Sequence, residues 1–364
     1  MFKKRSRLLA FSAAFGAAAL ILWFTSANFV EYSAFLRRLG LWVSSVLSGA
    51  LSILPFPLSE WVIIGAPVAV IVAVVMAFRR FGFKRGWTKA LVRLVFAVTL
   101  AAFIFMLTFG VQYTAPPLGE SLGLYVGLYS ADQLREVTDY FLRQANYYAA
   151  LAPRNAEGVC EFGSFEDISR AAMESYRGLA EGGEGYDYSV FSTPRRAAPK
   201  RSVILGVAMS YVGTAGYFFP WTGEAVVSGD YVDVQFPFCI AHEAAHAHGI
   251  AAENEANFAA FLACSASADT RLLYSGYFNA YIYAMNALYA ASPEDFYENA
   301  LGRSELLQRD LDGLSAHLAK YESPVRDAGS AINDSYIKAT GQAEGLKTYG
   351  MVVDLLLADY FRGK

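Results

Sequence analysis

The stretch FCIAHEAAHAHGIAAENEANFAAFLAC, residues 238–264, contains three of the chain's four histidines within seven positions. It starts as an apolar run, breaks at Gly249 and becomes apolar again after a short acidic segment. A glycine just past a helical pattern is typical of a helix that ends in the left-handed conformation. We therefore expect two helices, over 240–248 and 252–267, joined by a short turn and packed antiparallel.

His242, Glu243 and His246 form the pattern HExxH on the first of these helices. Residues four positions apart share one helix face, so both imidazoles can converge on one Zn²⁺. Glu243 adjoins the first ligand and can act as the general base that takes a proton from water. The pattern alone is common on ordinary helices. Its weight here comes from the Gly249 break, the acidic segment that follows and the scarcity of histidine elsewhere.

An acidic residue at the start of the second helix would lie beside the histidines and complete the site. Three protein ligands leave one position for water, which is the layout of a catalytic zinc site. We favour Glu253, with Glu255 as the alternative, about 200° away around the helix. Asn257, one turn after Glu253, is predicted to bond the second ring nitrogen of a ligand histidine. His248 is predicted to interact with the helix dipole rather than with a metal.

The first third of the chain concentrates the apolar residues of a sequence that is 55% hydrophobic and only 17% charged. Three uncharged runs, over 8–30, 61–78 and 94–111, are each predicted to span a membrane. The apolar stretch 32–56 between the first two is predicted either to lie in the interface or to be re-entrant. The chain is thus expected to have the lipid bilayer as a partner.

Basic residues predict the orientation of these spans. The N-terminal tail and the loop RRFGFKRGWTK, residues 79–89, are basic, and no Lys or Arg lies between the third run and Arg135. We therefore expect a cytoplasmic N-terminus and an extracytoplasmic C-terminal domain. The net charge of −3 offers no basic surface for nucleic acid.

The part after the spans, residues 119–364, is predicted to be a mostly α domain of the α+β class with a small sheet, following a membrane anchor over 1–118. The expected helices cover 130–150, 164–182, 270–290, 294–322 and 333–361, and the expected strands lie within 202–212 and 222–236. The three cysteines, Cys160, Cys239 and Cys264, do not form a disulfide framework, and their pairing stays open.

HExxH followed by an acidic helix start resembles the gluzincin class of zinc metallopeptidases. The run ENEANFAAFLAC, residues 253–264, is similar to the ExEANxFAA segment of ImmA/IrrE-type peptidases. The resemblance implies that Glu253 is the third ligand. It places Asn257 where many members have an aspartate.

Three segments together resemble a bacterial membrane family of unknown function: YFFPWTGEAVV at 217–227, HEAAHAHGIAAENEANF at 242–258 and INDSYIKATGQAEGLKTYG at 332–350. This resemblance implies a zincin-like domain behind N-terminal spans of the bacterial cytoplasmic membrane. In zincins an edge strand beside the metal helix holds the substrate backbone by strand addition, and GEAVVSGDYV at 223–232 is the matching segment.

The leading hypothesis is a membrane-anchored zinc peptidase that acts on a peptide or protein substrate. One Zn²⁺ would bind His242, His246 and Glu253, and Glu243 would activate water. A catalytically silent zinc- and peptide-binding scaffold or sensor is the alternative. An intramembrane protease is disfavoured because the apolar run 258–268 is too short to cross a bilayer. A side chain that stabilises the oxyanion is also expected, and five tyrosines are candidates by residue type alone: Tyr277, Tyr281, Tyr283, Tyr336 and Tyr349. Tyr336 and the nearby Lys338 are the first choices.

Overall fold

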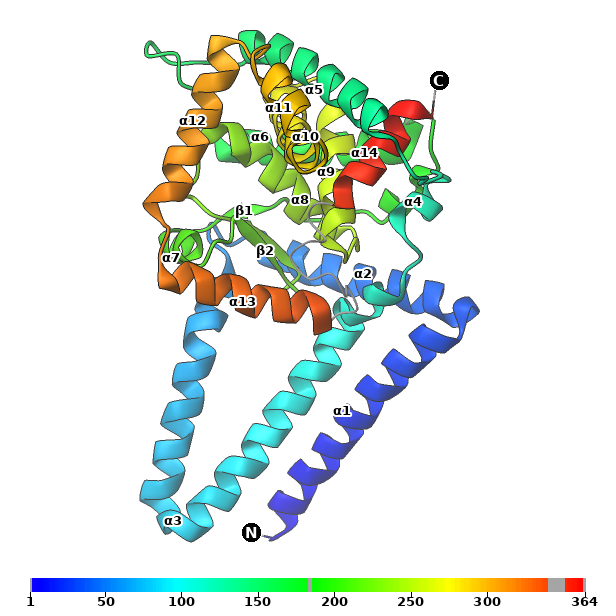
Figure 1. The fold of residues 1–364 in the computed structure, drawn as a ribbon. Helices are drawn as coiled ribbons and strands as arrows, with labels where there is room; N and C mark the ends of the chain where they lie inside the picture. Colours follow the sequence, from blue (N-terminus) through cyan, green and yellow to red (C-terminus); the bar gives the residue numbers. More distant parts are fainter. Residues whose placement is uncertain (1, 183–184, 340–350, 363–364) are drawn as a thin grey trace. The chain divides into compact units, whose positions relative to one another are not determined.

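The computed structural model describes residues 2–182, 185–339 and 351–362. Within these ranges the chain is mostly helical, with one small three-stranded sheet (Figure 1). It divides into two compact units, Met1–Ala115 with Phe219–Glu224 and Pro116–Phe218 with Ala225–Lys364. The first unit ends three residues before the predicted boundary and gains a short segment from the middle of the chain.

The first unit contains helices α1 (Phe2–Asn28), α2 (Val30–Leu51) and α3 (Leu58–Thr108), followed by the 3₁₀ helix η1 (Gly110–Thr114). Three segments are long and apolar enough to cross a membrane: Ser6–Asn28, Leu58–Gly82 and Arg85–Thr108. Each overlaps one predicted span. The number of spans is therefore as predicted and is consistent with a membrane anchor.

The stretch between the first two spans forms α2, which buries a face of small residues: Ser33, Gly40, Ser44, Ser45 and Ser48. Gly40 is needed for close packing, since a Cβ there would lie 2.4 Å from the carbonyl oxygen of Leu107 on α3. Small residues of this kind let helix backbones approach closely in apolar surroundings.

The segment Phe219–Glu224, a turn between two strands, also belongs to the first unit. The indole Nε1 of Trp221 donates to the carbonyl of Ala101 at 3.0 Å. The Glu224 carboxylate accepts from the backbone N–H groups of Leu58, at 3.0 Å, and Ser59, at 2.8 Å. Glu224 therefore caps α3, where a negative charge also complements the helix dipole.

The second unit begins with α4 (Leu118–Ser121), α5 (Ala131–Leu151) and α6 (Phe165–Gly182). The predicted capping box at the start of α5 is confirmed. Ser130 Oγ accepts from the Gln133 N–H at 3.2 Å, and Gln133 Oε1 accepts from the Ser130 N–H at 2.9 Å. This reciprocal pair satisfies two N–H groups that a helix start leaves open.

The prediction of a strand over 202–212 is wrong. Only β1 (Lys200–Arg201) is extended, and α7 (Gly206–Tyr211) follows, after the 3₁₀ helix η2 (Tyr188–Phe191). A short branched run cannot be assigned to strand or helix by periodicity alone. Here Gly213, with φ +74°, closes a short helix instead.

The sheet has the order β1-β3-β2, formed by β1, β2 (Gly216–Phe219) and β3 (Glu224–Val227). β1 runs parallel to β3, with Lys200 opposite Val226 and Arg201 opposite Val227. β3 is buried along its whole length and lies in the middle of the sheet, between β1 and β2. The prediction that GEAVVSGDYV forms an edge strand is therefore wrong, because β3 is paired on both sides and the edges of the sheet are β1 and β2.

The rest of the second unit is helical, after the short 3₁₀ helix η3 (Asp233–Gln235): α8 (Phe236–Ala247), α9 (Glu253–Ser265), α10 (Thr270–Ala291), α11 (Pro293–Ala300), α12 (Glu305–Lys320), α13 (Pro324–Ala339) and α14 (Val352–Phe361). The predicted single helix over 294–322 is two helices, because Ser304 caps a new start by accepting from the Leu307 N–H. The predicted helix over 333–361 falls on α13 and α14, with 340–350 outside the described residues.

Helices α8 and α9 form much of the core of this unit (Figure 1). Ala241, Ala244 and Ala245 on α8 and Ala256 and Ala259 on α9 are completely buried. These small side chains let the two helices pack closely on either side of the Gly249 turn. The stretch that carries the HExxH pattern is therefore buried inside the second unit.

Candidate metal centre

Three ligand atoms meet where α8 ends and α9 begins. One atom each from His242, His246 and Glu253 lies within 4.8 Å of the other two. The two histidine Nε2 atoms are 3.2 Å apart, and Glu253 Oε2 lies 3.3 Å from His242 Nε2 and 3.7 Å from His246 Nε2. The three residues that the sequence favoured as ligands are thus brought together.

The Gly249 turn positions the carboxylate. Gly249 has φ +95°, and its N–H donates to the His246 carbonyl while the Ile250 N–H donates to that of Ala245. These bonds satisfy the last carbonyls of α8 and reverse the chain within a few residues. Glu253 then becomes the first residue of α9, directly beside the histidines.

The separations fit a small tetrahedral cation. With bonds of about 2.0–2.1 Å, ligand atoms around tetrahedral Zn²⁺ lie about 3.3 Å from one another. The separations of 3.2, 3.3 and 3.7 Å bracket that value. Two imidazole nitrogens and one carboxylate oxygen are also the protein donors of many catalytic zinc sites. The three residues therefore fit a zinc ion by both geometry and chemistry.

A backbone carbonyl orients one of the two histidines. His246 Nδ1 lies 2.7 Å from the carbonyl oxygen of Ile250, which assigns the proton to Nδ1 and directs the Nε2 lone pair to the cluster. The sequence assigned such a role to Asn257. That side chain is buried on α9, and its Nδ2 has no hydrogen-bond partner among the described residues. A backbone carbonyl has no side-chain signature, so the sequence could not indicate Ile250.

Glu255, the alternative ligand, points elsewhere. Its Oε1 accepts from the backbone N–H of Leu118, at 2.8 Å, at the start of α4. Burial raises the pKa of Glu255 to about 7, although that N–H acts to lower it. Of the two candidate carboxylates, only Glu253 lies with the histidines.

Glu243 lies beside the cluster with an unsatisfied carboxylate. Its side chain is buried, and Oε2 has no hydrogen-bond partner among the described residues. Burial raises the pKa of Glu243 to about 7, against the lowering effect of His242 and His246. A base with a pKa near neutrality suits proton transfer at physiological pH.

Gly216 on the edge strand β2 packs against Glu243. A Cβ at Gly216 would lie 2.4 Å from Glu243 Oε1 and 2.7 Å from its Cγ. Only glycine therefore leaves room for the carboxylate at this point. Gly216 was not among the predicted site residues, although a glycine in a strand often marks close approach of another group.

The ligand charges also affect one another. Burial by itself would lower the pKa of His246 and raise that of Glu253. The attraction between these two groups exceeds both effects, so the pKa of His246 rises to about 9 and that of Glu253 falls well below its usual range. The cluster is thus electrostatically coupled before any cation is considered.

The other residues chosen by type lie outside the cluster. Lys338 on α13 pairs with Asp334 at 2.7 Å, and Tyr336 is about half exposed. Tyr277 stacks on Tyr148 with ring centroids 5.3 Å apart.

Two further tyrosines complete the predicted set. The Tyr281 hydroxyl donates to Asn299. Burial raises the pKa of Tyr283, with smaller contributions from Cys239 and Glu253, so Tyr283 lies within electrostatic range of the cluster. Tyr349 lies outside the described residues.

His248 is not part of the cluster either. It is the C-cap of α8, and its ring lies 4.9 Å from that of Tyr176. Burial lowers the pKa of His248 to about 3, and both ring nitrogens lack a hydrogen-bond partner among the described residues, which favours an uncharged ring over the predicted interaction with the helix dipole. All three cysteines are free and buried, and none belongs to the candidate metal site.

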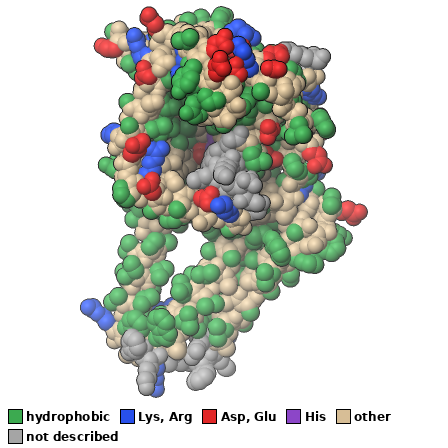
Figure 2. Space-filling view, in the orientation of Figure 1, with side chains coloured by type: hydrophobic (Ala, Val, Ile, Leu, Met, Phe, Trp, Pro, Cys, Tyr) green, Lys and Arg blue, Asp and Glu red, His purple; other side chains and the backbone are tan. Residues whose placement is uncertain are grey.

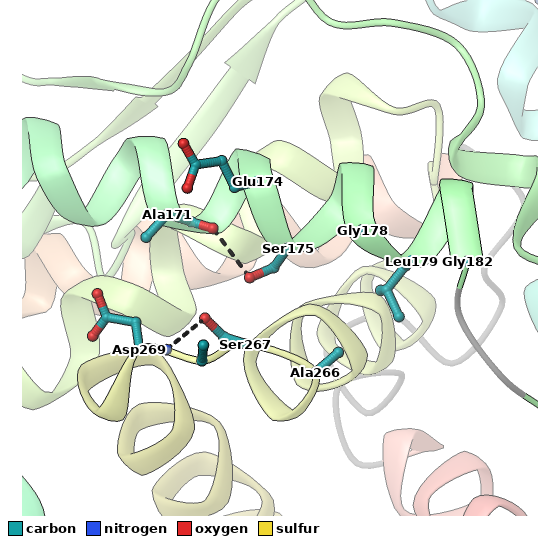
Figure 3. Close-up of a pocket in the computed structure, with 10 residues that line it drawn as sticks. Ala171, Glu174, Ser175, Gly178, Leu179, Gly182, Ala266, Ser267 and Asp269 are labelled. Atoms are coloured by element: carbon teal, nitrogen blue, oxygen red, sulfur yellow. Dashed lines mark hydrogen bonds between the residues drawn. The ribbon is translucent and has the colours of Figure 1, made fainter.

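A separate open groove of about 660 Å³ lies between α6 and the turn after α9 (Figure 3). Its lining is mostly small, with Glu174 and Asp269 as the charged side chains. Ala266 and Ser267 in this lining are thirteen or more residues beyond Glu253, which corresponds to about 20 Å along a helix. This end of the groove is therefore remote from Glu253 and the candidate metal site.

Comparison with known proteins places the chain in a family of unknown function. The model of a family described as "Protein of unknown function (DUF3810)" matches residues 35–357. No curated protein and no solved structure matches the chain. The resemblance to gluzincins and to ImmA/IrrE-type peptidases therefore depends on the residues quoted above.

Proposed function

The chain belongs to the DUF3810 family, and we propose that it is a membrane-anchored, zinc-dependent peptidase. The observation that carries the proposal is the meeting of His242, His246 and Glu253 within 4.8 Å, beside the buried carboxylate of Glu243. A structural zinc site is usually closed by four protein ligands, whereas three leave a position for water. The described residues contribute three.

The chemistry follows from the roles of these side chains. A bound Zn²⁺ would act as a Lewis acid and lower the pKa of water toward neutrality. Glu243 then accepts a proton from the attacking water as its oxygen bonds to the peptide carbonyl carbon. The same carboxyl group returns that proton to the amide nitrogen as the C–N bond breaks. Water is thereby divided between the new carboxyl and amino ends.

The edge strand supports a peptide over other hydrolysable substrates. In this proposal an extended peptide would run beside β2, an edge strand of the sheet, and be held through its own backbone. Gly216 on β2 packs against Glu243. A peptide paired along this strand would therefore have its backbone close to the general base.

The test uses the purified full chain in detergent under metal-replete conditions. Zinc content is measured by mass spectrometry, and hydrolysis is measured on a library of peptide substrates. We expect about one zinc per chain in the wild type. Glu243→Gln should keep zinc and lose roughly 10²- to 10⁴-fold in cleavage rate, while His246→Ala should lose zinc. Wild-type protein without zinc would refute the proposal.

Zinc without cleavage would instead favour the alternative of a zinc- and peptide-binding scaffold. Envelope and secreted proteins of a wild-type strain and a Glu243→Gln strain would distinguish the two, because a scaffold leaves their cleavage patterns unchanged. The orientation, with the N-terminus in the cytoplasm and the second unit outside, stays a prediction. Cysteine accessibility from each side of the membrane would test it.

A further inference from the structure

The bend of α3 carries an unusual concentration of positive charge. Between residues 61 and 119 the chain has six Lys or Arg and no Asp or Glu, and all six basic residues lie within 79–93. We call residues 79–93 the basic bend. It lies where the candidate span Leu58–Gly82 ends and the candidate span Arg85–Thr108 begins. Its charges are therefore at the edge of the hydrocarbon region, whichever side of the membrane that is.

The backbone holds this bend in a tight shape. Gly82 has φ +69° and ψ 170°, which interrupts the helix and reverses its direction. At Gly86 an added Cβ would lie 2.8 Å from the Phe78 side chain and 2.9 Å from the Ala77 carbonyl oxygen. The two limbs of α3 therefore touch beside the bend, where Arg79, Arg80 and Arg85 are exposed.

The charges of the basic bend repel one another. Arg79, Arg80, Arg85 and Arg93 are exposed, and none forms an ion pair with a carboxylate among the described residues. Lys89 lies within electrostatic range of three of these arginines. Its ammonium sits 2.9 Å from the centre of the Phe81 ring. Like charges this close are costly at the edge of an apolar phase unless an anion lies between them.

An exposed tryptophan indicates that the basic bend lies at the level of the lipid headgroups. Trp87 is 55% exposed and stacks on Phe78, with ring centroids 6.4 Å apart and planes 2° from parallel. Exposed tryptophan at the end of a spanning helix is typical of the headgroup level of a bilayer. Figure 2 shows hydrophobic side chains covering the helical legs of the first unit, with Lys and Arg toward their lower end. An anion between these groups would lie among lipid headgroups.

We propose that the basic bend binds the phosphate groups of anionic phospholipids. The guanidinium groups of Arg79, Arg80, Arg85 and Arg93 would pair with phosphate oxygens, which suit their planar array of donors. The acyl chains would pack along the apolar limbs of α3, beside Trp87. This surface is independent of the proposed peptidase activity and of the orientation of the chain.

The test reconstitutes the full chain in nanodiscs of phosphatidylcholine mixed with phosphatidylglycerol and measures retained lipids by native mass spectrometry. Wild-type protein should retain phosphatidylglycerol preferentially. The quadruple variant R79Q/R80Q/R85Q/R93Q should weaken this retention on the order of 100-fold. A quadruple Arg→Lys variant at the same positions keeps the charges and should retain most of the preference.

A matched control removes four exposed arginines of the second unit, R143Q/R170Q/R177Q/R196Q, and changes net charge equally. Its lipid preference should equal that of the wild type. Equal retention of both lipids by the wild type would overturn the proposal, as would equal loss in the control. Displacement of the lipid by inorganic phosphate at similar affinity would also overturn it, because the site would then serve a soluble anion. If the Arg→Gln variant fails to fold, the test rests on whether the wild-type protein retains phosphatidylglycerol in preference to phosphatidylcholine.

Discussion

Two buried polar clusters in the second unit differ in how completely their atoms are paired. Asp310 on α12 accepts both terminal guanidinium nitrogens of Arg154, at 3.0 and 2.6 Å, and the Tyr274 hydroxyl at 2.5 Å. In the candidate metal site, by contrast, His242 Nδ1 and Glu243 Oε2 have no hydrogen-bond partner among the described residues. The first cluster is complete within the protein, whereas the second is not.

This difference suggests that the fully paired cluster stabilises the fold, whereas the incompletely paired one binds a ligand. Buried polar groups are almost always hydrogen-bonded, because an unpaired one costs about 1–3 kcal/mol. The Asp310 cluster avoids that cost and connects α10 and α12 with Arg154, in the segment after α5, through side-chain bonds. The candidate metal site keeps the cost of unpaired polar atoms, at residues whose side chains converge on one point. We expect substitutions in the first cluster to reduce folding stability and substitutions in the second to reduce zinc binding or catalysis.

The largest effect is expected from Asp310→Asn. This change leaves the buried Arg154 guanidinium without its counter-charge, and breaking a buried pair in this way typically costs about 3–5 kcal/mol. Denaturant unfolding of the full chain in detergent would measure it, with zinc content unchanged. Arg135→Gln is the control, because the Arg135 pairs are solvent-exposed, with Arg135 itself 43% exposed, and should contribute under about 1 kcal/mol. Equal losses in both variants would contradict the contrast.

The next effect compares two glutamates that are two residues apart. Glu253→Gln removes a proposed ligand and should weaken zinc binding by at least about 100-fold, since even changes in outer-shell partners of a metal cost 10- to 100-fold. Glu255→Gln makes the same chemical change where the side chain accepts from the Leu118 N–H, so zinc affinity should stay unchanged. Competition with a zinc-chelating dye would measure both. A greater loss for Glu255→Gln would exchange the two roles.

Gly216→Ala should reduce catalysis without removing zinc. The new methyl group would lie 2.4 Å from Glu243 Oε1 and push the carboxylate aside. A displacement of about 1 Å at a reacting group can cost about 100-fold, so we expect a loss of roughly 10- to 100-fold in kcat. Gly178→Ala on α6 is the matched control, since a Cβ there meets nothing within 4 Å. Full activity in Gly216→Ala would show that Glu243 can relocate freely.

The smallest effect is expected from His248→Phe. Both ring nitrogens of His248 are buried without partners among the described residues, and the ring packs against those of Tyr176 and Phe191. Replacing an unpaired polar ring by an apolar one should leave stability unchanged or raise it by up to about 1–2 kcal/mol. Thermal unfolding would measure the change. Marked destabilisation, or loss of zinc, would mean that the imidazole has a polar role that the contrast between the clusters omits.

Local chemistry made several features predictable. The spans follow from long uncharged runs, and the start of α5 follows from the Ser130–Gln133 capping box. The helices α8 and α9 and the turn between them follow from apolar periodicity and Gly249. The spacing of His242 and His246 puts two imidazoles on one face of any helix. All of these depend on residues close together in the chain.

Local patterns were insufficient where contacts cross long stretches of sequence. The strand expected over 202–212 is mostly a short helix, because a brief branched run suits either structure. Glu253 and Glu255 both begin the same helix. Helix geometry favoured Glu253 over Glu255 as the ligand, but only the fold shows that Glu255 instead accepts from the N–H of Leu118, more than a hundred residues earlier.

By itself, the sequence determined the apolar spans, the Gly249 turn and a pair of histidines on one helix face, since each depends on composition or on spacings of a few residues. Only the tertiary structure decided that Glu253 meets those histidines, that the Ile250 carbonyl orients His246, and that Gly216 packs against Glu243. These contacts depend on how the backbone turns and on which elements pack together. Backbone groups are the same at every residue, so no sequence pattern distinguishes them in advance.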